Sequence, residues 1–322
     1  MRKKEEPILV AIHCLVYNHE PYLRDCFEGF VKQKTNFRFV AIVHEDCSTD
    51  NSAAIIREYE AKYPDIFRPI YESENQWSKH DGSLERIMNN AIDATGAKYV
   101  AMCEGDDYWT DPLKLQKQVD ILEADPDFSM CYSDFETVDE HNNVIHWQNH
   151  ESHAKRSFTG YQFRELLNGN YIITATILVR AVVYMHPAIV NNLDYSQVLN
   201  ASLKGKFYYI KEKLARYRSN PNSLTNTQLD KIAGVSREIW CNFVEYYLNT
   251  PAVHRNFVDY VCTISTIDAV LISQLRSKGD VAQHARELLS RHKVLWTTYP
   301  FGILLRVQNR LRKMIRKYAQ RS

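Results

Sequence analysis

The sequence lacks the cysteine patterns that indicate a disulfide framework or a zinc ribbon. Seven cysteines are scattered along 322 residues, and no two of them form a CxxC pair. An odd number of unpaired, widely spaced cysteines argues against both kinds of staple. We therefore expect a protein of a reducing compartment, the cytoplasm.

Long apolar runs are also missing. No segment approaches the roughly 18 apolar residues that span a bilayer, and the apolar run after Met-Arg-Lys-Lys-Glu-Glu-Pro is too short for a secretory signal. The formal net charge of +1 argues against a general attraction to nucleic acid. There are no internal repeats and no low-complexity tracts. We expect a cytoplasmic protein that touches a membrane, if at all, peripherally on its inner face.

The first 110 residues alternate between short apolar segments and amphipathic segments. This alternation predicts an α/β fold, with a mostly parallel sheet and helices on both faces. The predicted strands cover 8–16, 37–44, 67–71 and 99–103. The predicted helices begin after an Asn18 N-cap and cover 52–63 and 84–94.

The second part of the chain continues with a helix at 111–123, strands at 128–135, 171–179 and 206–215, and a helix at 194–203. From about residue 228 only helices are predicted. The expected domains are therefore 1–226, with halves at 7–110 and 111–226, and a helical region at 227–322.

An acidic cluster ends the fourth predicted strand. The apolar run Tyr99 to Cys103 is followed by Glu104, Asp106 and Asp107. Carboxylates crowded at a strand end repel one another unless a cation or a set of donors lies between them. A solvated acidic turn would explain Asp111 before the next helix, but explains the three preceding acids poorly. Right-handed crossovers would bring Tyr17 and Asp46 to the same edge of the sheet.

Four ordered motifs resemble the inverting nucleotide-sugar glycosyltransferases of family 2, which have the GT-A fold. Val16-Tyr17-Asn18 is similar to the family's "TYN", and Glu45–Asp50 to "DDGSTD", with Cys47 in place of glycine. Glu104–Asp107 stands where the family has "DxDD", followed in register by Trp109, Pro112, Lys114, Leu115 and Gln118. Asp194 precedes Gly205-Lys206, Tyr217-Arg218 and Ser223. The resemblance covers residues 7–226, and it implies that 7–110 is the nucleotide-binding half and 111–226 the acceptor half of this domain.

The resemblance implies a nucleotide site formed by the ends of the first two strands. Tyr17 would stack on the base; alternatively, it only plugs the sheet edge. Asp46 would accept the imide N–H of uracil; alternatively, it caps the next helix. Arg86 would contact the diphosphate, although such an arginine is more often a solvated helix residue.

The same resemblance implies a divalent cation at the acidic cluster. Asp106 would bind Mn²⁺ or Mg²⁺ between the two phosphates, since oxygen ligands suit these ions better than zinc. Glu104 replaces the family's first aspartate and would reach a ribose hydroxyl. Asp107 would hold a water on the metal or orient the loop.

Asp194 matches the family's catalytic base, which would take the proton of an acceptor hydroxyl. Its alternative role is the N-cap of the helix to Leu203. The implied activity is the transfer of a sugar from a nucleotide-sugar donor to a hydroxyl of a glycan or lipid-linked glycan. We expect the donor to be UDP-linked and the process to be cell-envelope polysaccharide biosynthesis. The alternatives are a sugar nucleotidyltransferase, disfavoured because the loop after the first strand lacks glycine and basic residues, and a non-catalytic nucleotide-sugar-binding module.

Two further segments attract attention. Residues 301–322 carry seven basic and no acidic side chains, with apolar residues at helical spacing. This segment either binds an anionic membrane surface or packs on the domain. His146, His150 and His153 could suggest zinc, but without suitable partners they indicate a variable acceptor-side loop.

Overall fold

The computed structural model describes residues 6–79, 81–146, 150–187, 194–219 and 229–275. Within these residues the core is one eight-stranded sheet in the order β3-β2-β1-β4-β7-β6-β8-β5. The pairs β1–β2, β1–β4, β2–β3 and β6–β8 are parallel, and the remaining pairs are antiparallel. The predicted α/β class and mostly parallel sheet are therefore confirmed.

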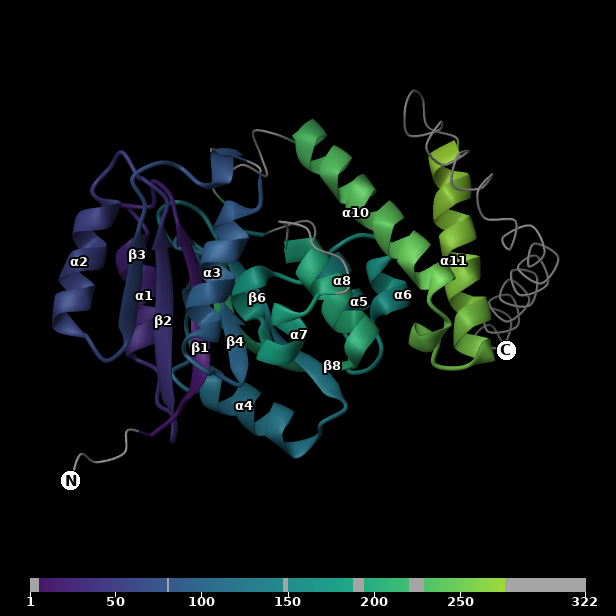
Figure 1. Ribbon diagram of the computed structural model, residues 1–322, viewed down its shortest axis with the longest axis horizontal. Coiled ribbons are helices and arrows are strands. Elements are labelled where there is room, and N and C mark those ends of the chain that lie inside the picture. Colours follow the sequence, from purple (N-terminus) through teal and green to yellow (C-terminus); the bar gives the residue numbers. More distant parts are fainter. Residues whose placement is uncertain (1–5, 80, 147–149, 188–193, 220–228, 276–322) are drawn as a thin grey trace. The chain divides into compact units, whose positions relative to one another are not determined.

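The parallel half of the sheet is formed by the first strands of the chain. They are β1 (Ile8–Val16), β2 (Arg38–Glu45), β3 (Phe67–Tyr71) and β4 (Tyr99–Met102). The connecting helices are α1 (Leu23–Val31), α2 (Ser52–Lys62) and α3 (Ser83–Asp93), with the short 3₁₀ helix η1 (Trp77–Lys79) before α3. Figure 1 shows these four strands side by side, with α3 on the near face and α1 on the far face.

Alternation along β1 divides the core between the two faces. Val10, Ile12, Cys14 and Val16 belong to one apolar cluster with buried side chains of α1 and α2. The other face of β1 packs against α3, and His13 on this face lies 6.1 Å, between ring centroids, from Tyr184. Burial of both faces of a parallel sheet explains why these strands are almost continuously apolar.

The second half of the sheet is built around a long strand pair. β6 (Phe128–Val138) lies parallel to β8 (Lys206–Arg218), and the short strands β5 (Tyr108–Trp109) and β7 (Leu178–Arg180) flank them. The helices of this half are α4 (Lys114–Ala124), α5 (His150–Arg156), α7 (Ala181–Met185) and α8 (Asp194–Lys204).

Two local predictions were wrong. The β-branched segment 171–179 forms a strand only from Leu178, and its middle is the 3₁₀ helix η2 (Thr174–Thr176), whose carbonyls bind side chains instead of a neighbouring strand. Asn18 does not cap α1, which begins after Tyr22. Instead Asn18 has a φ of +54°, and its side-chain oxygen accepts a hydrogen bond from the Thr49 amide.

The chain forms two compact units, residues 1–162 with 171–234 and residues 163–170 with 235–322. The second unit contains α6 (Phe163–Leu166), most of α10 (Leu229–Asn249), η3 (Pro251–Val253) and α11 (Phe257–Leu275). The predicted boundary at residue 226 and the basic segment 301–322 lie outside the described residues. Among the described helices, none is long and apolar enough to cross a membrane.

Candidate active site at the sheet edge

The carboxyl ends of β1, β2 and β4 meet at one edge of the sheet. The Asp46 amide donates to the Val16 carbonyl at 3.0 Å, and the Gly105 amide donates to the Leu15 carbonyl at 3.0 Å. These bonds fix the loops that follow β2 and β4 on either side of Tyr17. The expected meeting of Tyr17, Asp46 and the acidic cluster at one edge is therefore confirmed.

The loop that carries the acidic cluster is packed closely against neighbouring side chains. Gly105 has no room for a side chain, since an added Cβ would lie 2.7 Å from Nδ1 of His19. Desolvation, followed by the charges of Asp106 and Asp194, raises the pKa of Glu104 to about 8. Burial and the nearby Asp106 also raise the pKa of Asp107 well above its usual range. The cluster therefore favours a bound proton or a cation.

Asp107 and Asp106 differ in their exposure and in which of their atoms accept hydrogen bonds. Asp107 is 4% exposed, and its Oδ1 accepts a hydrogen bond from the Arg218 amide at 2.8 Å. That contact suits the predicted role of orienting the loop. Asp106 is partly exposed, and its backbone carbonyl accepts a bond from Nε of Arg218 at 2.9 Å. The Asp106 carboxylate stays available for a ligand.

The buried Arg218 is the residue whose role the sequence pattern did not reveal. Its guanidinium also donates to the Asp139 carbonyl at 2.9 Å and to the Asn142 side chain at 2.8 Å, and forms an ion pair with Asp25 at 3.3 Å. Arg218 thus ties the acidic loop to α1 and to the turn after β6. The Tyr217-Arg218 motif marked the position, but its partners are distant in sequence.

The nucleotide candidates at the ends of β1 and β2 have different surroundings. Tyr17 is 47% exposed, as a stacking role requires. The Asp46 carboxylate accepts hydrogen bonds from the amides of Gln76 at 2.6 Å and Trp77 at 3.0 Å. Asp46 therefore caps η1, and the alternative that it caps α2 is wrong. A carboxylate has about four acceptor positions, so acceptor capacity remains beside Tyr17.

Arg86 lies in the first turn of α3, on an exposed surface. Its guanidinium donates to the Asp81 carbonyl at 2.8 Å and lies 4.0 Å from the Asp81 carboxylate. Both contacts are local to the turn that precedes α3. The described position therefore matches the solvated alternative, and contact with a diphosphate stays a prediction.

Asp194 begins α8, and its carboxylate is held from two sides. Oδ1 accepts a bond from the Tyr195 amide at 2.7 Å, and Oδ2 accepts one from the Thr174 hydroxyl at 3.0 Å. The side chain keeps solvent-exposed surface, yet desolvation by surrounding protein atoms raises the pKa of its carboxyl. Because Asp194 also raises the pKa of Glu104, it lies within electrostatic range of the acidic cluster.

The residues around Asp106 fit a divalent cation held jointly with a ligand. Among the described residues there is no group of three or more His, Cys, Asp or Glu that could hold a metal by itself. A cation at Asp106 would therefore take most of its oxygens from a diphosphate and water, as Mg²⁺ commonly does. Desolvation first, and then the neighbouring carboxylates, raise the pKa values of Glu104 and Asp107, so a cation bound here would favour their ionised forms.

The predicted histidine segment is a small hydrogen-bonded cluster. Nε2 of His150 lies 3.2 Å from Oδ1 of Asp134, and Nε2 of His153 lies 3.8 Å from the same atom. His153 also bonds the Tyr171 carbonyl, and burial lowers its pKa. His146 is exposed and lies outside this cluster's contacts.

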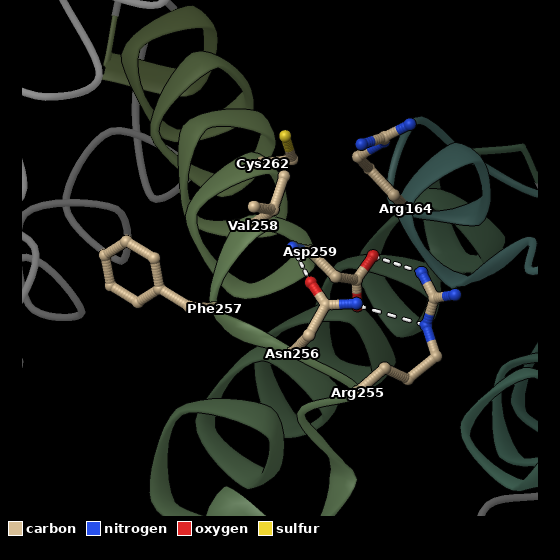
Figure 2. Close-up of a pocket in the computed structure, with 7 residues that line it drawn as sticks. All are labelled: Arg164, Arg255, Asn256, Phe257, Val258, Asp259 and Cys262. Carbon is tan, nitrogen blue, oxygen red and sulfur yellow. Dashed lines mark hydrogen bonds and ion pairs between the residues drawn. The ribbon is translucent and has the colours of Figure 1, made fainter.

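A separate pocket lies within the second unit and contains none of the predicted site residues (Figure 2). Its volume is about 610 Å³, and Phe257 and Val258 at its rim are 72% and 70% exposed. Arg255 faces this pocket, but its guanidinium is paired with Asp259. The acidic side chain that lines this pocket, Asp259, is thus engaged by Arg255, unlike the carboxylate of Asp106 at the sheet edge.

Comparison with known proteins shows the family of this chain. The sequence profile of "Glycosyl transferase family 2" matches residues 12–185, somewhat more than half of the chain. An uncharacterized Mycobacterium tuberculosis protein, Rv1520, is 32% identical over 224 residues, which are 67% of this chain and 60% of that protein. The chain thus spans less than two thirds of that relative. TuaG of Bacillus subtilis, described as a putative teichuronic acid biosynthesis glycosyltransferase, is 26% identical, covering 75% of this chain and 95% of TuaG.

Solved structures show the same fold. S. aureus TarS in complex with UDP-GlcNAc superposes with a TM-score of 0.54 at 12% identity over 92% of both chains. The mannosyltransferase PcManGT from Pyrobaculum calidifontis, in complex with GDP-Man and Mn²⁺, gives 0.51 at 13% identity over 95% of this chain and 90% of its own. The fold is the GT-A fold that the four motifs implied, and the chain belongs to glycosyl transferase family 2.

Proposed function

We propose that this protein transfers a sugar from a nucleotide-sugar donor to a hydroxyl group of a glycan or lipid-linked glycan, with inversion at the anomeric carbon. The observation that supports the proposal is the proximity of the acidic cluster to Asp194. The pKa of Glu104, raised first by desolvation, is raised further by Asp106 and Asp194, so the candidate cation ligand and the candidate general base both lie within electrostatic range of Glu104. Transfer to a hydroxyl is promoted by a base that takes the proton and by a cation that stabilises the leaving diphosphate.

The donor side of the proposal rests on Tyr17, Asp46 and Asp106. Tyr17 would stack on the base, and Asp46 would accept its imide N–H, which favours a UDP-linked donor. TarS was solved with UDP-GlcNAc and PcManGT with GDP-Man and Mn²⁺, so both nucleotides belong in a test. A Mn²⁺ or Mg²⁺ ion bound with the diphosphate would offset the charge of the leaving group.

On the acceptor side, Asp194 would remove the proton of the attacking hydroxyl. One displacement from the face opposite the leaving nucleotide inverts the anomeric centre, by analogy with inverting hydrolases. The teichuronic acid role named for TuaG supports a glycan acceptor. Glu104, with its pKa near 8, would be protonated in the ligand-free site and could donate a hydrogen bond to a hydroxyl group of the nucleotide sugar.

The test is nucleotide release from UDP-glucose, UDP-GlcNAc, UDP-galactose and GDP-mannose, with manganese and a glycan acceptor panel. Asp194→Asn keeps the hydrogen-bond acceptor for Tyr195 but removes the base, so we expect a fall in kcat of about 10²–10⁴-fold with UDP binding retained. Asp93→Asn, at the exposed end of α3, is the matched control. Undiminished turnover by Asp194→Asn would refute the assignment.

We also propose that the basic segment 301–322 attaches the protein to an anionic membrane, where a lipid-linked acceptor would be presented. The support is its sequence pattern alone, seven basic side chains with apolar residues at helical spacing. A chain truncated after Pro300 should lose cosedimentation with phosphatidylglycerol vesicles that the full chain shows. Equal cosedimentation of both would assign binding to another surface.

A further inference from the structure

The two functional parts of the site are joined by a short buried element that the four motifs do not include. η2 (Thr174–Thr176) is completely buried at Ala175 and Thr176. Each of its three residues forms a hydrogen bond with a side chain that is distant in sequence. Thr174 reaches the proposed base, and the carbonyls of Ala175 and Thr176 reach the region that follows the acidic cluster.

The contact with the acidic cluster runs through Trp109. The indole N–H of Trp109 donates to the Ala175 carbonyl at 2.9 Å. Trp109 lies two residues after Asp107 in β5, and it is 4% exposed. This buried hydrogen bond therefore fixes the position of η2 relative to the loop that carries Asp106 and Asp107.

A second contact comes from α4. Nε2 of Gln118 donates to the Thr176 carbonyl at 2.8 Å, and Oε1 of Gln118 accepts a bond from Nζ of Lys114 at 2.7 Å. Lys114 is fully buried, and its Nζ lies 4.3 Å from the centre of the Trp109 ring. Lys114, Gln118 and Trp109 thus form one buried network that holds two successive carbonyls of η2.

The remaining residue of η2 faces the proposed base. Thr174 Oγ1 donates to Oδ2 of Asp194 at 3.0 Å, and the other carboxylate oxygen is held by the Tyr195 amide. With both oxygens bonded, rotation of the carboxylate is restricted. The position of Asp194 is therefore linked through η2 to the loop that carries Asp106.

We propose that Thr174 is a positioning residue for the general base, and that η2 sets the placement of Asp194 relative to the acidic cluster. This inference rests on the proposed function of Asp194. The hydroxyl holds the carboxylate in the orientation that accepts the acceptor's proton. Misplacing a catalytic group by about 1 Å can cost about 10²-fold in rate, so the contact should affect turnover strongly and donor binding little.

The hydrogen bond also acts on the charge of the base. Desolvation raises the pKa of Asp194, whereas the bonds from Thr174 and the Tyr195 amide lower it. Among the described residues, Glu104 and Tyr217 are titratable groups whose pKa values the charge of Asp194 raises. Removing the hydroxyl should therefore raise the pKa of Asp194 and leave less of the base ionised at low pH.

The experiment compares Thr174→Val with Thr174→Ser, using the nucleotide-release assay with UDP-GlcNAc or GDP-mannose and manganese. We expect Thr174→Val to lower kcat about 10–100-fold, with KM for the donor within about twofold. The acidic limb of the kcat/KM profile should move to higher pH by about 0.5–1 unit. Thr174→Ser keeps the hydroxyl and should restore most of the rate.

Two controls separate positioning from folding. Thr95→Val removes a hydroxyl that bonds the Ile92 carbonyl at the end of α3, and should leave the rate and the pH profile unchanged. If the valine lowers Tm by several degrees, Thr174→Ala takes its place, because it removes atoms without adding a methyl group at the hydroxyl position.

The outcomes distinguish this inference from the proposed function. An inactive Asp194→Asn together with a Thr174→Val enzyme of normal kcat and pH profile would overturn the positioning role alone. Equal losses in Thr174→Val and Thr174→Ser would overturn it as well, because the hydroxyl would not matter. Full activity of Asp194→Asn would instead overturn the base assignment on which the inference depends.

Discussion

At the scale of single residues, Cys47 shows how the site departs from its family's pattern. It stands where the resembling motif has glycine, and its φ is +62°. This left-handed conformation costs an L-residue roughly 1–2 kcal/mol relative to glycine. The position that carries glycine in the family's motif therefore has a backbone conformation that glycine adopts without cost and that cysteine adopts at a cost.

We predict that Cys47→Gly stabilises the folded protein by about 0.5–1 kcal/mol, the relief of strain being partly offset by glycine's larger unfolded-state entropy. Urea denaturation would measure the change. Gly96 is the matched control, because its φ is +65° and no atom lies within 4 Å of an added Cβ. Gly96→Ala should destabilise by a similar amount. A neutral or destabilising Cys47→Gly would contradict the strain argument.

Residue identities predicted which side chains gather at the sheet edge, but not what each one contacts. Tyr17, Asp46 and the acidic cluster follow apolar strands, so parallel topology was enough to bring them together. The Asp46 carboxylate binds the amides of η1, and no local pattern encodes that choice. Such contacts depend on loop geometry, which the chain settles only after the sheet has formed.

At the scale of elements, several strands and helices were predicted to within one residue, whereas β6 and β8 extend three residues beyond their predicted ends and α4 begins three residues later than predicted. β1 and β3 have the predicted bounds, and α8 extends one residue beyond its prediction. The segment 171–179 failed because a buried β-branched run satisfies strand propensity, whereas its carbonyls are taken by Trp109 and Gln118. Tertiary hydrogen bonds overrode local preference there.

Arg218 provides the element-scale prediction, since it joins the end of β8 to the acidic loop, α1 and the turn after β6. Arg218 is 1% exposed, and its removal leaves the partly buried carbonyls of Asp106 and Asp139 and the side-chain oxygen of Asn142 without this donor. We expect Arg218→Met to destabilise the protein by about 3–5 kcal/mol and to weaken UDP–Mn²⁺ binding. Urea denaturation and calorimetry would measure the two effects.

The adjacent Arg216 supplies the comparison for Arg218. Its guanidinium is partly exposed and pairs with Glu136 at 3.0 Å. Exposed ion pairs contribute little, so Arg216→Met should cost less than about 1 kcal/mol. Similar losses of stability in the two variants would show that Arg218 contributes no more than a surface arginine and does not hold the acidic loop in place.

At the scale of the whole molecule, the crowded and desolvated carboxyl groups at the sheet edge link stability to pH and to cations. The pKa of Glu104 is raised from 4.5 to about 8, first by desolvation. The folded state therefore holds a proton that the unfolded chain releases at lower pH. The contribution of Glu104 to the stability of the ligand-free protein should fall as pH rises from about 5 to about 8, since the folded pKa lies above the unfolded one.

A cation with a diphosphate should reverse this trend. We predict that UDP with Mn²⁺, at about 100 times Kd, raises Tm by roughly 5–10 °C. The increase should be larger at pH 8 than at pH 6, because a cation competes with the proton on Glu104 for the same negative field. Mn²⁺ or UDP alone should raise Tm much less, since each supplies only part of the other's contacts.

Two variants test whether Asp106 holds the cation that produces this pH-dependent increase in Tm. Asp106→Asn should abolish the Mn²⁺-dependent part of the shift, whereas Asp194→Asn should retain it because the base does not hold the ion. Differential scanning fluorimetry with EDTA, Mg²⁺ and Mn²⁺ would measure both. A full Mn²⁺-dependent shift in Asp106→Asn would place the ion on other residues. An equal shift at pH 6 and pH 8 would mean that the acidic cluster does not exchange a proton for the cation.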